Sequence, residues 1–222
     1  MYSMEEEEIA KRYNLDLGKI KQEQVKLAKS LKIKDSIDFS LTEKIAAIES
    51  ITVKNKIISA VVVCDKENNI IEQQYFLDKL KFPYLHEFRS YREVESMIGA
   101  FNKIQERVDL VLLRGHGITH PRLGLASHFS ISVNVPSVGV SDVLFDEDKI
   151  EEDNILKDGK KVGKVFLSKE GSTPIYISPG NNISVDSSLK IIKKLIVPPH
   201  KFPEPMHLAH KYVRDIKEEL KL

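Results

Sequence analysis

The arrangement of apolar residues changes near the middle of the chain, and this change constrains the fold more than any other feature. Three extended segments rich in β-branched residues come first, at residues 44–53, 56–64 and 70–77, with short polar turns between them. Consecutive strands joined by tight turns pair antiparallel, as a meander. In the second half, short and continuously apolar strands alternate with helical spacing, which is typical of parallel strands joined by crossover helices. The pattern therefore predicts a mixed sheet flanked by helices.

The order of the remaining elements predicts a fold class. Apolar residues that recur every three or four positions indicate helices, and short apolar runs between turn residues indicate strands. We expect helices within residues 1–40 and at 91–105, 121–131 and 184–196, and strands at 109–113, 137–140, 160–168 and 174–178. The proline-rich stretch 198–205 is expected as an extension along the edge, followed by a short C-terminal helix. This order is that of a ribonuclease-H-like α/β fold, predicted as one domain over residues 1–222 with an N-terminal helical region.

The charge balance excludes a strong global preference for polyanions. Thirty-four Lys and Arg residues against 33 Asp and Glu leave a net charge of +1. Such a chain has no overall electrostatic bias toward nucleic acids or acidic membranes, so a nucleic-acid partner has to be argued from a local site. The proportions of hydrophobic residues, 41%, and charged residues, 30%, are typical of a globular protein.

The single cysteine and the absence of long apolar stretches narrow the possible partners. Cys64 has no second cysteine to pair with, which excludes an intrachain disulfide framework and a multi-cysteine metal site. Its apolar neighbours predict a buried, inert thiol and no disulfide-linked partner. No stretch approaches the roughly 20 apolar residues that cross a bilayer. The acidic N-terminus lacks an apolar signal core, so we expect a cytoplasmic protein with no membrane partner.

The most informative motif is the run RGHGITHPRLGLASHF, which begins at Arg114. It leaves a predicted buried strand, and ligands of α/β sheets bind outside the carboxyl ends of strands. Gly115 and Gly117 permit a close approach of the backbone, and His116 and His120 concentrate polar groups in the loop. From the residues alone, the run is either a binding loop or a tight turn whose histidines cap a helix and bond to the backbone.

This run resembles the endonuclease V family, whose pattern is DGHG-I-(A/S)-HPR-R-LG-(L/V)-ASH. Other segments agree in the family's order: Phe88-Arg89, the run VPSVGV from Val135, the run SPGNNISVDS from Ser178, and Pro203-Glu204-Pro205. The resemblance extends from about Gln24 to about His210. It implies a ribonuclease-H-like fold and Mg²⁺-dependent cleavage of DNA or RNA near deaminated purines, chiefly inosine.

The resemblance places the family's catalytic positions on residues of different chemistry. The Asp of the first strand falls on Glu49, the Glu of FRE on Ser90, the Asp of DGHG on Arg114, the Lys after GVA on Asp142, and the His of GHR on Asn181. Mg²⁺ needs about six oxygen ligands, and a guanidinium a few ångström away repels it by several kcal/mol. We therefore predict no metal site. We also predict that Arg114 forms an ion pair with Asp142 or with Glu49 in its place.

The leading hypothesis is a catalytically degenerate endonuclease V-like protein that binds DNA or RNA containing deaminated bases without cofactors. The backbone N–H groups of the glycine-rich loop would recognise the edge of a flipped base. Phe82 and Tyr84 could stack on a base in the segment where the family has an aromatic wedge, although the family's Tyr falls on Lys81. The residues expected to contact nucleic acid are Gly115, His116, Gly117, Ile118, His120, Arg122, Phe82 and Tyr84.

Two alternatives belong to other classes of function. In the first, Glu49 and Asp142, with Glu87 or Glu93, form a rearranged catalytic site that uses Mg²⁺ to cut DNA or RNA 3′ to inosine. In the second, the protein is a non-catalytic subunit that binds a protein partner, with the helical region 7–31 as the candidate surface. The sequence does not distinguish DNA from RNA.

Overall fold

The computed structural model describes residues 4–145 and 149–222, and one mixed sheet runs through them. The strands are β1 (Ile45–Val53), β2 (Lys56–Cys64), β3 (Ile70–Lys79), β4 (Leu110–Arg114), β5 (Ser137–Ser141), β6 (Lys149–Glu151), β7 (Asn154–Lys157), β8 (Lys160–Phe166) and β9 (Ile175–Asn181). Their order across the sheet is β3-β2-β1-β4-β5-β9-β8-β7-β6. β1, β2 and β3 form an antiparallel meander, whereas β1, β4 and β5 run parallel. The predicted change from antiparallel to parallel pairing is confirmed.

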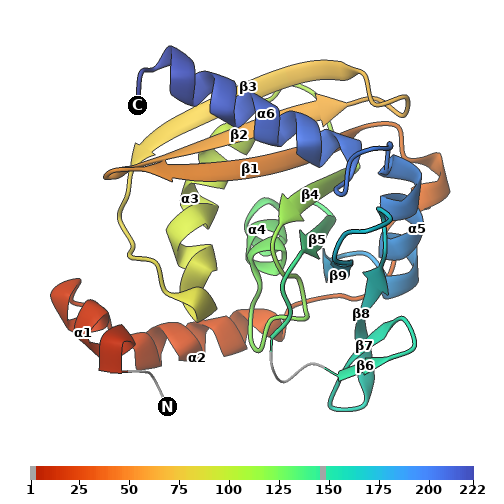
Figure 1. The fold of residues 1–222 in the computed structure, drawn as a ribbon. Helices are drawn as coiled ribbons and strands as arrows, with labels where there is room; N and C mark the ends of the chain where they lie inside the picture. Colours follow the sequence, from red (N-terminus) through yellow and green to blue (C-terminus); the bar gives the residue numbers. More distant parts are fainter. Residues whose placement is uncertain (1–3, 146–148) are drawn as a thin grey trace.

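Helices cover both faces of the sheet (Figure 1). They are α1 (Met4–Arg12), α2 (Leu17–Ala28), α3 (Arg89–Phe101), α4 (Leu125–Val133), α5 (Val185–Leu195) and α6 (Glu204–Glu219), with 3₁₀ turns η1 (Phe39–Leu41) and η2 (His86–Phe88). α3 and α4 share one apolar cluster with the sheet, and α5 and α6 share the other. No helix in the part of the chain that the structure describes has the length and apolar character needed to cross a membrane.

The alternation of side chains along β1 explains how two cores form around one sheet. Ala46 and Ile48 belong to the cluster under α3 and α4, whereas Ile45 and Ala47 belong to the cluster under α5 and α6. Successive residues of a strand point to opposite faces, so a continuously apolar segment supplies both cores. Cys64 is fully buried, and burial raises the pKa of its thiol to about 12, as expected of an inert core cysteine.

The N-terminal region is less helical than predicted. Within residues 1–40 the structure has α1, α2 and the short η1 turn, and α2 ends at Ala28. The following segment passes the end of β9 instead, where the Asn181 side chain accepts a hydrogen bond from the Lys32 N–H at 2.8 Å. The Ser36 N–H donates to the Asn182 carbonyl nearby. These tertiary contacts hold the segment in a non-helical conformation.

The C-terminal helix was expected to be short, and this prediction is wrong. α6 is 16 residues long and packs across β1 and β2. After Pro205 its buried residues Met206, Ala209, Val213 and Ile216 recur every three or four positions, which is the spacing of a core-facing helix. Strands β6 and β7 were not predicted, because three- and four-residue strands carry too little periodicity to be recognised.

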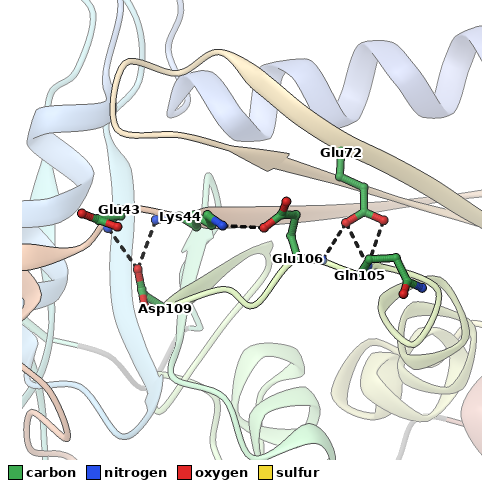
Figure 2. A network of polar contacts seen from close by, with 6 residues as sticks. All are labelled: Glu43, Lys44, Glu72, Gln105, Glu106 and Asp109. Atoms are coloured by element: carbon green, nitrogen blue, oxygen red, sulfur yellow. Dashed lines mark hydrogen bonds and ion pairs between the residues drawn. The ribbon is translucent and has the colours of Figure 1, made fainter.

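A polar network holds the amino-terminal ends of β1 and β4 in register, at the opposite end of these strands from the glycine-rich loop (Figure 2). The Asp109 carboxylate accepts hydrogen bonds from the backbone N–H groups of Glu43 and Lys44 at 3.0 and 3.1 Å. The Lys44 ammonium donates to Glu106 at 2.5 Å. The Glu72 carboxylate accepts from the Glu106 N–H at 2.9 Å. The connection from α3 to β4 is thus bound to β3 and to the residues before β1, which sets where β4 begins.

Candidate functional site

An ion pair between Arg114 and Asp142 occupies the carboxyl ends of the two central parallel strands. Arg114 is the last residue of β4 and pairs with Val140 of β5, and Asp142 follows the end of β5. Their side chains approach to 3.1 Å between Nη2 and Oδ2. Of the two partners considered for Arg114, the structure therefore has Asp142. Because both side chains are partly solvent-exposed, the pair contributes about 1 kcal/mol or less to stability.

The Arg114 guanidinium has a second contact that sequence reasoning missed. Its central carbon lies 4.6 Å from the centre of the Phe202 ring, which comes from the segment before α6. The negative face of an aromatic ring attracts a cation at this distance. Arg114 therefore contacts both Asp142, which follows β5, and Phe202, which lies in the segment before α6. No sequence pattern connects positions 114 and 202, because only the packing of α6 over the sheet brings them together.

Glu49 lies in the middle of β1, on the face that α6 covers, and is only 9% exposed. Burial raises the pKa of its carboxyl group to about 7, although the nearby positive charges of Arg114 and Arg89 oppose this shift. The negative charges of Glu93 and Asp142 add to the increase. A carboxyl group that changes charge near neutral pH in a partly enclosed position is typical of functional sites.

His210 of α6 completes this cluster and was not among the residues selected from the sequence. Its Nδ1 lies 3.7 Å from Oε1 of Glu49 and is buried without a hydrogen-bond partner among the described residues. Burial, followed by the charges of Arg114 and Arg214, lowers the pKa of His210. The motif Pro203-Glu204-Pro205 indicated where α6 begins. Which turn of α6 lies opposite Glu49 depends on how the helix packs on β1 and β2.

Ser90 and Asn181, which fall on two of the family's catalytic positions, lie in different parts of the structure. Ser90 is the second residue of α3, lies close to the glycine-rich loop, and shares a 3.1 Å hydrogen bond with Nδ1 of His128. Asn181 pairs with Ser137, the first residue of β5, and therefore lies at the opposite end of that strand from Asp142. Asn181 holds the N-terminal segment and is not part of the cluster around Arg114.

The described residues do not fit a Mg²⁺ site. Glu87, one of the carboxylates considered for a rearranged site, binds Arg122 at 2.5 Å. Glu93, the other, accepts two hydrogen bonds from Arg89, at 2.6 and 3.0 Å. Nowhere in residues 4–145 and 149–222 do three or more histidine, cysteine or acidic side chains gather in a way that could hold a metal ion. A hard divalent cation prefers several oxygen ligands, whereas the centre of this site holds a guanidinium.

A cavity of about 130 Å³ opens beside the ion pair and contains part of the glycine-rich loop. Its lining includes Tyr84, Ser90, Gly115, His116, His120 and Asp142. Burial, with the nearby charges of His86 and Arg89, lowers the pKa of His116 to about 4, so this imidazole is neutral at pH 7. The Phe145 ring lies 4.7 Å from the His116 ring and 5.0 Å from the His120 ring. The cavity therefore combines aromatic and imidazole rings with charged and hydroxyl groups, among them Arg89, Asp142 and Ser90.

The backbone of the loop is largely engaged with the rest of the protein, which corrects its expected role. The N–H of Gly117 donates to the Ser178 hydroxyl at 2.8 Å, and the N–H of Ile118 donates to the Pro179 carbonyl at 2.9 Å. The N–H of Gly115 donates to Val140 of β5. These three groups hold the loop on β5 and β9, so they are not free to recognise the edge of a base.

His120 and Arg122 have structural roles in the loop. Nδ1 of His120 accepts hydrogen bonds from the backbone N–H groups of Arg122 and Leu123, at 3.0 and 3.1 Å. The Arg122 side chain is buried, where it binds Gln24 of α2 at 2.7 Å in addition to Glu87. This arrangement is the capped turn that the sequence left open as an alternative. The sequence predicted that this helix begins at Pro121. The capped turn explains why α4 begins at Leu125 instead.

The two aromatic residues expected to stack on a base differ in exposure. Phe82 is buried in a cluster with Ala10, Leu17 and Phe88, so it supports α1 and α2 and is not available to a base. Tyr84 is 58% exposed and lies on the rim of the cavity. Of these two rings, only that of Tyr84 is exposed to solvent.

His120 makes stability depend on pH. Burial, followed by the charges of Arg122 and His116, lowers the pKa of His120 to about 3, whereas an unfolded histidine titrates near 6.5. The unfolded chain therefore binds more protons between these values. The contribution of neutral His120 to the free energy of unfolding is fully present above about pH 6.5. It decreases as the pH falls toward 3, by up to about 1.4 kcal/mol per pH unit.

The variant His120→Asn tests this dependence, because an amide oxygen can replace the Nδ1 acceptor and does not titrate. We expect the free energy of unfolding, measured by urea denaturation from pH 7 to pH 4.5, to fall less steeply in His120→Asn than in the wild type. His207→Asn, a histidine of α6 outside the loop, is the matched control and should follow the wild type. Equal slopes for wild type and His120→Asn would contradict the assignment.

The comparisons with known proteins agree with this fold and these motifs. The family model of endonuclease V matches residues 25–211. The chain belongs to the endonuclease V family. Among curated relatives, endonuclease V of Thermosipho melanesiensis is 34% identical over 79% of this chain and 80% of its own length. Endonuclease V of Archaeoglobus fulgidus is 29% identical over 93% of this chain and 96% of its own length.

Solved structures of the family have the same fold. The catalytic domain of human endonuclease V superposes with a TM-score of 0.84 at 22% identity, covering 93% of this chain and 98% of that one. Ciona intestinalis endonuclease V, solved with a 24mer DNA containing an inosine followed by a ribo-adenosine, superposes with a TM-score of 0.83 at 22% identity, covering 92% and 98%. The ribonuclease-H-like fold predicted for this endonuclease V family member is confirmed.

Proposed function

We propose that this endonuclease V family member binds DNA or RNA containing deaminated bases, such as inosine, and does not cleave it by metal-dependent hydrolysis. The observation that carries the proposal is the ion pair of Arg114 and Asp142, 3.1 Å apart, at the centre of the site. Hydrolysis of a phosphodiester by Mg²⁺ needs carboxylates that converge on the ion. A guanidinium at this point repels a divalent cation but attracts the phosphate of a nucleic acid.

The cavity offers side chains for contact with one edge or face of a base. Its volume of about 130 Å³ is below the roughly 150 Å³ of an apolar cavity that holds one benzene ring, so a purine, which is a larger fused bicycle, would enter it only in part. A neutral imidazole offers one donor and one acceptor, and His116 shares them with the hydroxyls of Thr119 and Ser141 at 3.1 and 3.5 Å. The exposed ring of Tyr84 at the rim provides a surface on which a base can stack. Base recognition would therefore rest on side chains, because the loop's N–H groups at Gly115, Gly117 and Ile118 are engaged.

Binding and cleavage measured on the same oligonucleotides test the proposal. Fluorescence anisotropy of single-stranded and duplex DNA and RNA, with and without one inosine, should show inosine-selective binding that is unchanged in EDTA. Gel analysis in Mg²⁺ or Mn²⁺ should show no cutting. The variant Tyr84→Ala should weaken binding by about 1–3 kcal/mol, the value of one base stacked on an aromatic ring.

Two outcomes would contradict the proposal in different ways. Metal-dependent cutting that disappears in Glu49→Ala would show a rearranged active site. Failure to bind any of the oligonucleotides, with a normal unfolding transition, would exclude nucleic acid and leave the protein partner as the remaining hypothesis.

A further inference from the structure

A second hollow, about 470 Å³ in volume, runs between the carboxyl-terminal half of α6 and the last residues of β1. Three cations line it, Arg214, Lys217 and Lys221, and Glu218 is the acidic residue among the lining side chains. Ile51 and Val53 of β1 contribute apolar surface. We call the row of Arg214, Lys217 and Lys221 the basic groove.

Two of these cations lie on α6 and the third lies just beyond its end. Arg214 and Lys217 are three residues apart, which brings their side chains to the same side of the helix, and Lys221 follows the last helical residue, Glu219. Val213 and Ile216, on another face, are buried against β2 in a cluster with Ile58 and Ala60. The packing of the helix thus leaves the basic row beside β1. Among the described residues, no carboxylate forms an ion pair with any of the three cations.

The basic groove is continuous with the candidate site. Glu49, Ile51 and Val53 alternate along β1, so their side chains lie on the same face of the strand. On α6, His210 lies one turn before Arg214, lines the same hollow, and approaches Glu49 to 3.7 Å. Figure 1 shows α6 crossing β1 and ending on the side of the molecule where β1 also ends. The groove therefore begins at the site and leads away from it.

We propose that the basic groove binds the phosphodiester backbone of the strand that leaves the base-binding cavity. This inference rests on the proposed function and adds the path of the strand to it. Lys221 comes seven residues after Arg214, five of them to the end of α6 at Glu219, so the row extends over roughly 10 Å. A stacked strand advances about 3.4 Å per nucleotide, so three cations along this length match about three consecutive phosphates. The groove offers charge to the backbone and few hydrogen-bonding groups to bases, so it contributes affinity without sequence preference.

The triple variant Arg214→Gln, Lys217→Gln and Lys221→Gln tests the proposal against single-stranded oligonucleotides that contain one inosine. Its affinity at low salt should fall by about tenfold or more. The slope of log K against log salt should become shallower by about 2, because each lost phosphate contact on a single strand contributes about 0.7. The ratio of affinities for inosine and for unmodified strands should be unchanged.

The matched control is Lys21→Gln and Lys26→Gln on α2 with Lys29→Gln just after it, which removes the same number of positive charges from a different surface. It should bind with nearly the affinity and the salt slope of the wild type. A second measurement needs no variant: amine-reactive labelling of Lys217 and Lys221 in the wild type should decrease when the oligonucleotide is bound, whereas labelling of Lys21 should not.

The possible failures are distinguishable. In one outcome, the wild type binds inosine strands, the folded groove variant keeps the salt slope of the wild type, and binding does not change the labelling of Lys217. This outcome refutes the role of the basic groove, and the proposed function stands. If the wild type binds no oligonucleotide, the proposed function is refuted and the basic groove with it.

Discussion

Substituting Ser90→Glu, Arg114→Asp and Asp142→Lys, which restores the residues of the family pattern at three positions, should give this chain Mg²⁺ binding that the wild type lacks. The change replaces the guanidinium at the end of β4 with a carboxylate beside Glu49, and it moves the positive charge to the end of β5. Three carboxylates then lie around one point, as a hard divalent cation requires. If the ion pair of Arg114 and Asp142 replaces a metal site, reversing it should recreate that site.

Thermal unfolding measures this gain without depending on activity. Mg²⁺ at a hundredfold excess over its dissociation constant stabilises a protein by about 2.7 kcal/mol, which corresponds to roughly 5–10 °C in Tm for a chain of this size. We expect this shift in the triple variant and no shift in the wild type. Cutting of inosine-containing strands in Mg²⁺ should appear in the same variant.

Two controls separate the effect of the site from that of net charge. Arg114→Asp alone places a carboxylate beside Asp142 without a compensating cation, so it should lower the Tm in EDTA. Adding Asn181→His to the triple variant should lower the Tm, because the bond from Lys32 is lost, but it should not change the increase in Tm that Mg²⁺ produces, because Asn181 lies at the far end of β5. A triple variant that folds but is indifferent to Mg²⁺ would show that the ion pair is not what keeps the metal away.

Gly117→Ala should destabilise the protein by about 3 kcal/mol or more, whereas Gly115→Ala, two residues away, should cost less than about 1 kcal/mol. A Cβ on Gly117 would lie 2.0 Å from the Pro179 carbonyl oxygen, which belongs to β9 and cannot move without breaking the sheet. A Cβ on Gly115 would meet Leu125 at 3.4 Å, an ordinary contact. Neither glycine has a positive φ, so the difference comes from packing alone.

Urea denaturation of the two variants at pH 7 checks this prediction. Gly117→Ala should also lower the Tm by about 6–12 °C, provided that it folds well enough to be purified. Gly115→Ala should unfold like the wild type, which makes it useful for testing the cavity without loss of stability. Equal destabilisation of both variants would mean that the loop does not pack on β9 as the structure has it.

The elements predicted well from the sequence are those whose pattern is local. The boundaries of β2 were predicted correctly, because a continuous run of β-branched residues lies between two clear turns. The boundary of α4 was not, because the turn before it depends on Nδ1 of His120 accepting bonds from two backbone N–H groups. Such a turn has no periodicity. The predicted α6 was too short, although its buried apolar residues recur every three or four positions up to Ile216.

The site was predicted only in part, because some of its contacts depend on local motifs and others depend on tertiary packing. The ion pair of Arg114 and Asp142 followed from two motifs at the ends of neighbouring parallel strands, which topology brings together. Phe202 and His210 were missed, because they reach the site only through the packing of α6 on the sheet. Asn181 was grouped with the catalytic positions by its motif, yet the antiparallel pairing of β9 with β5 carries it to the other end of the strand.

The sequence by itself determined the order of the elements, the family and the exchange of charge at positions 114 and 142, because each of these depends on residues in one strand or one motif. The tertiary structure alone decided which members of the glycine-rich loop face the cavity and which hold the loop in place. Gly115 and Gly117 look equivalent in the sequence, but only Gly117 is pressed against β9. Burial and neighbouring charge are properties of the folded chain, and they decide what each side chain is free to do.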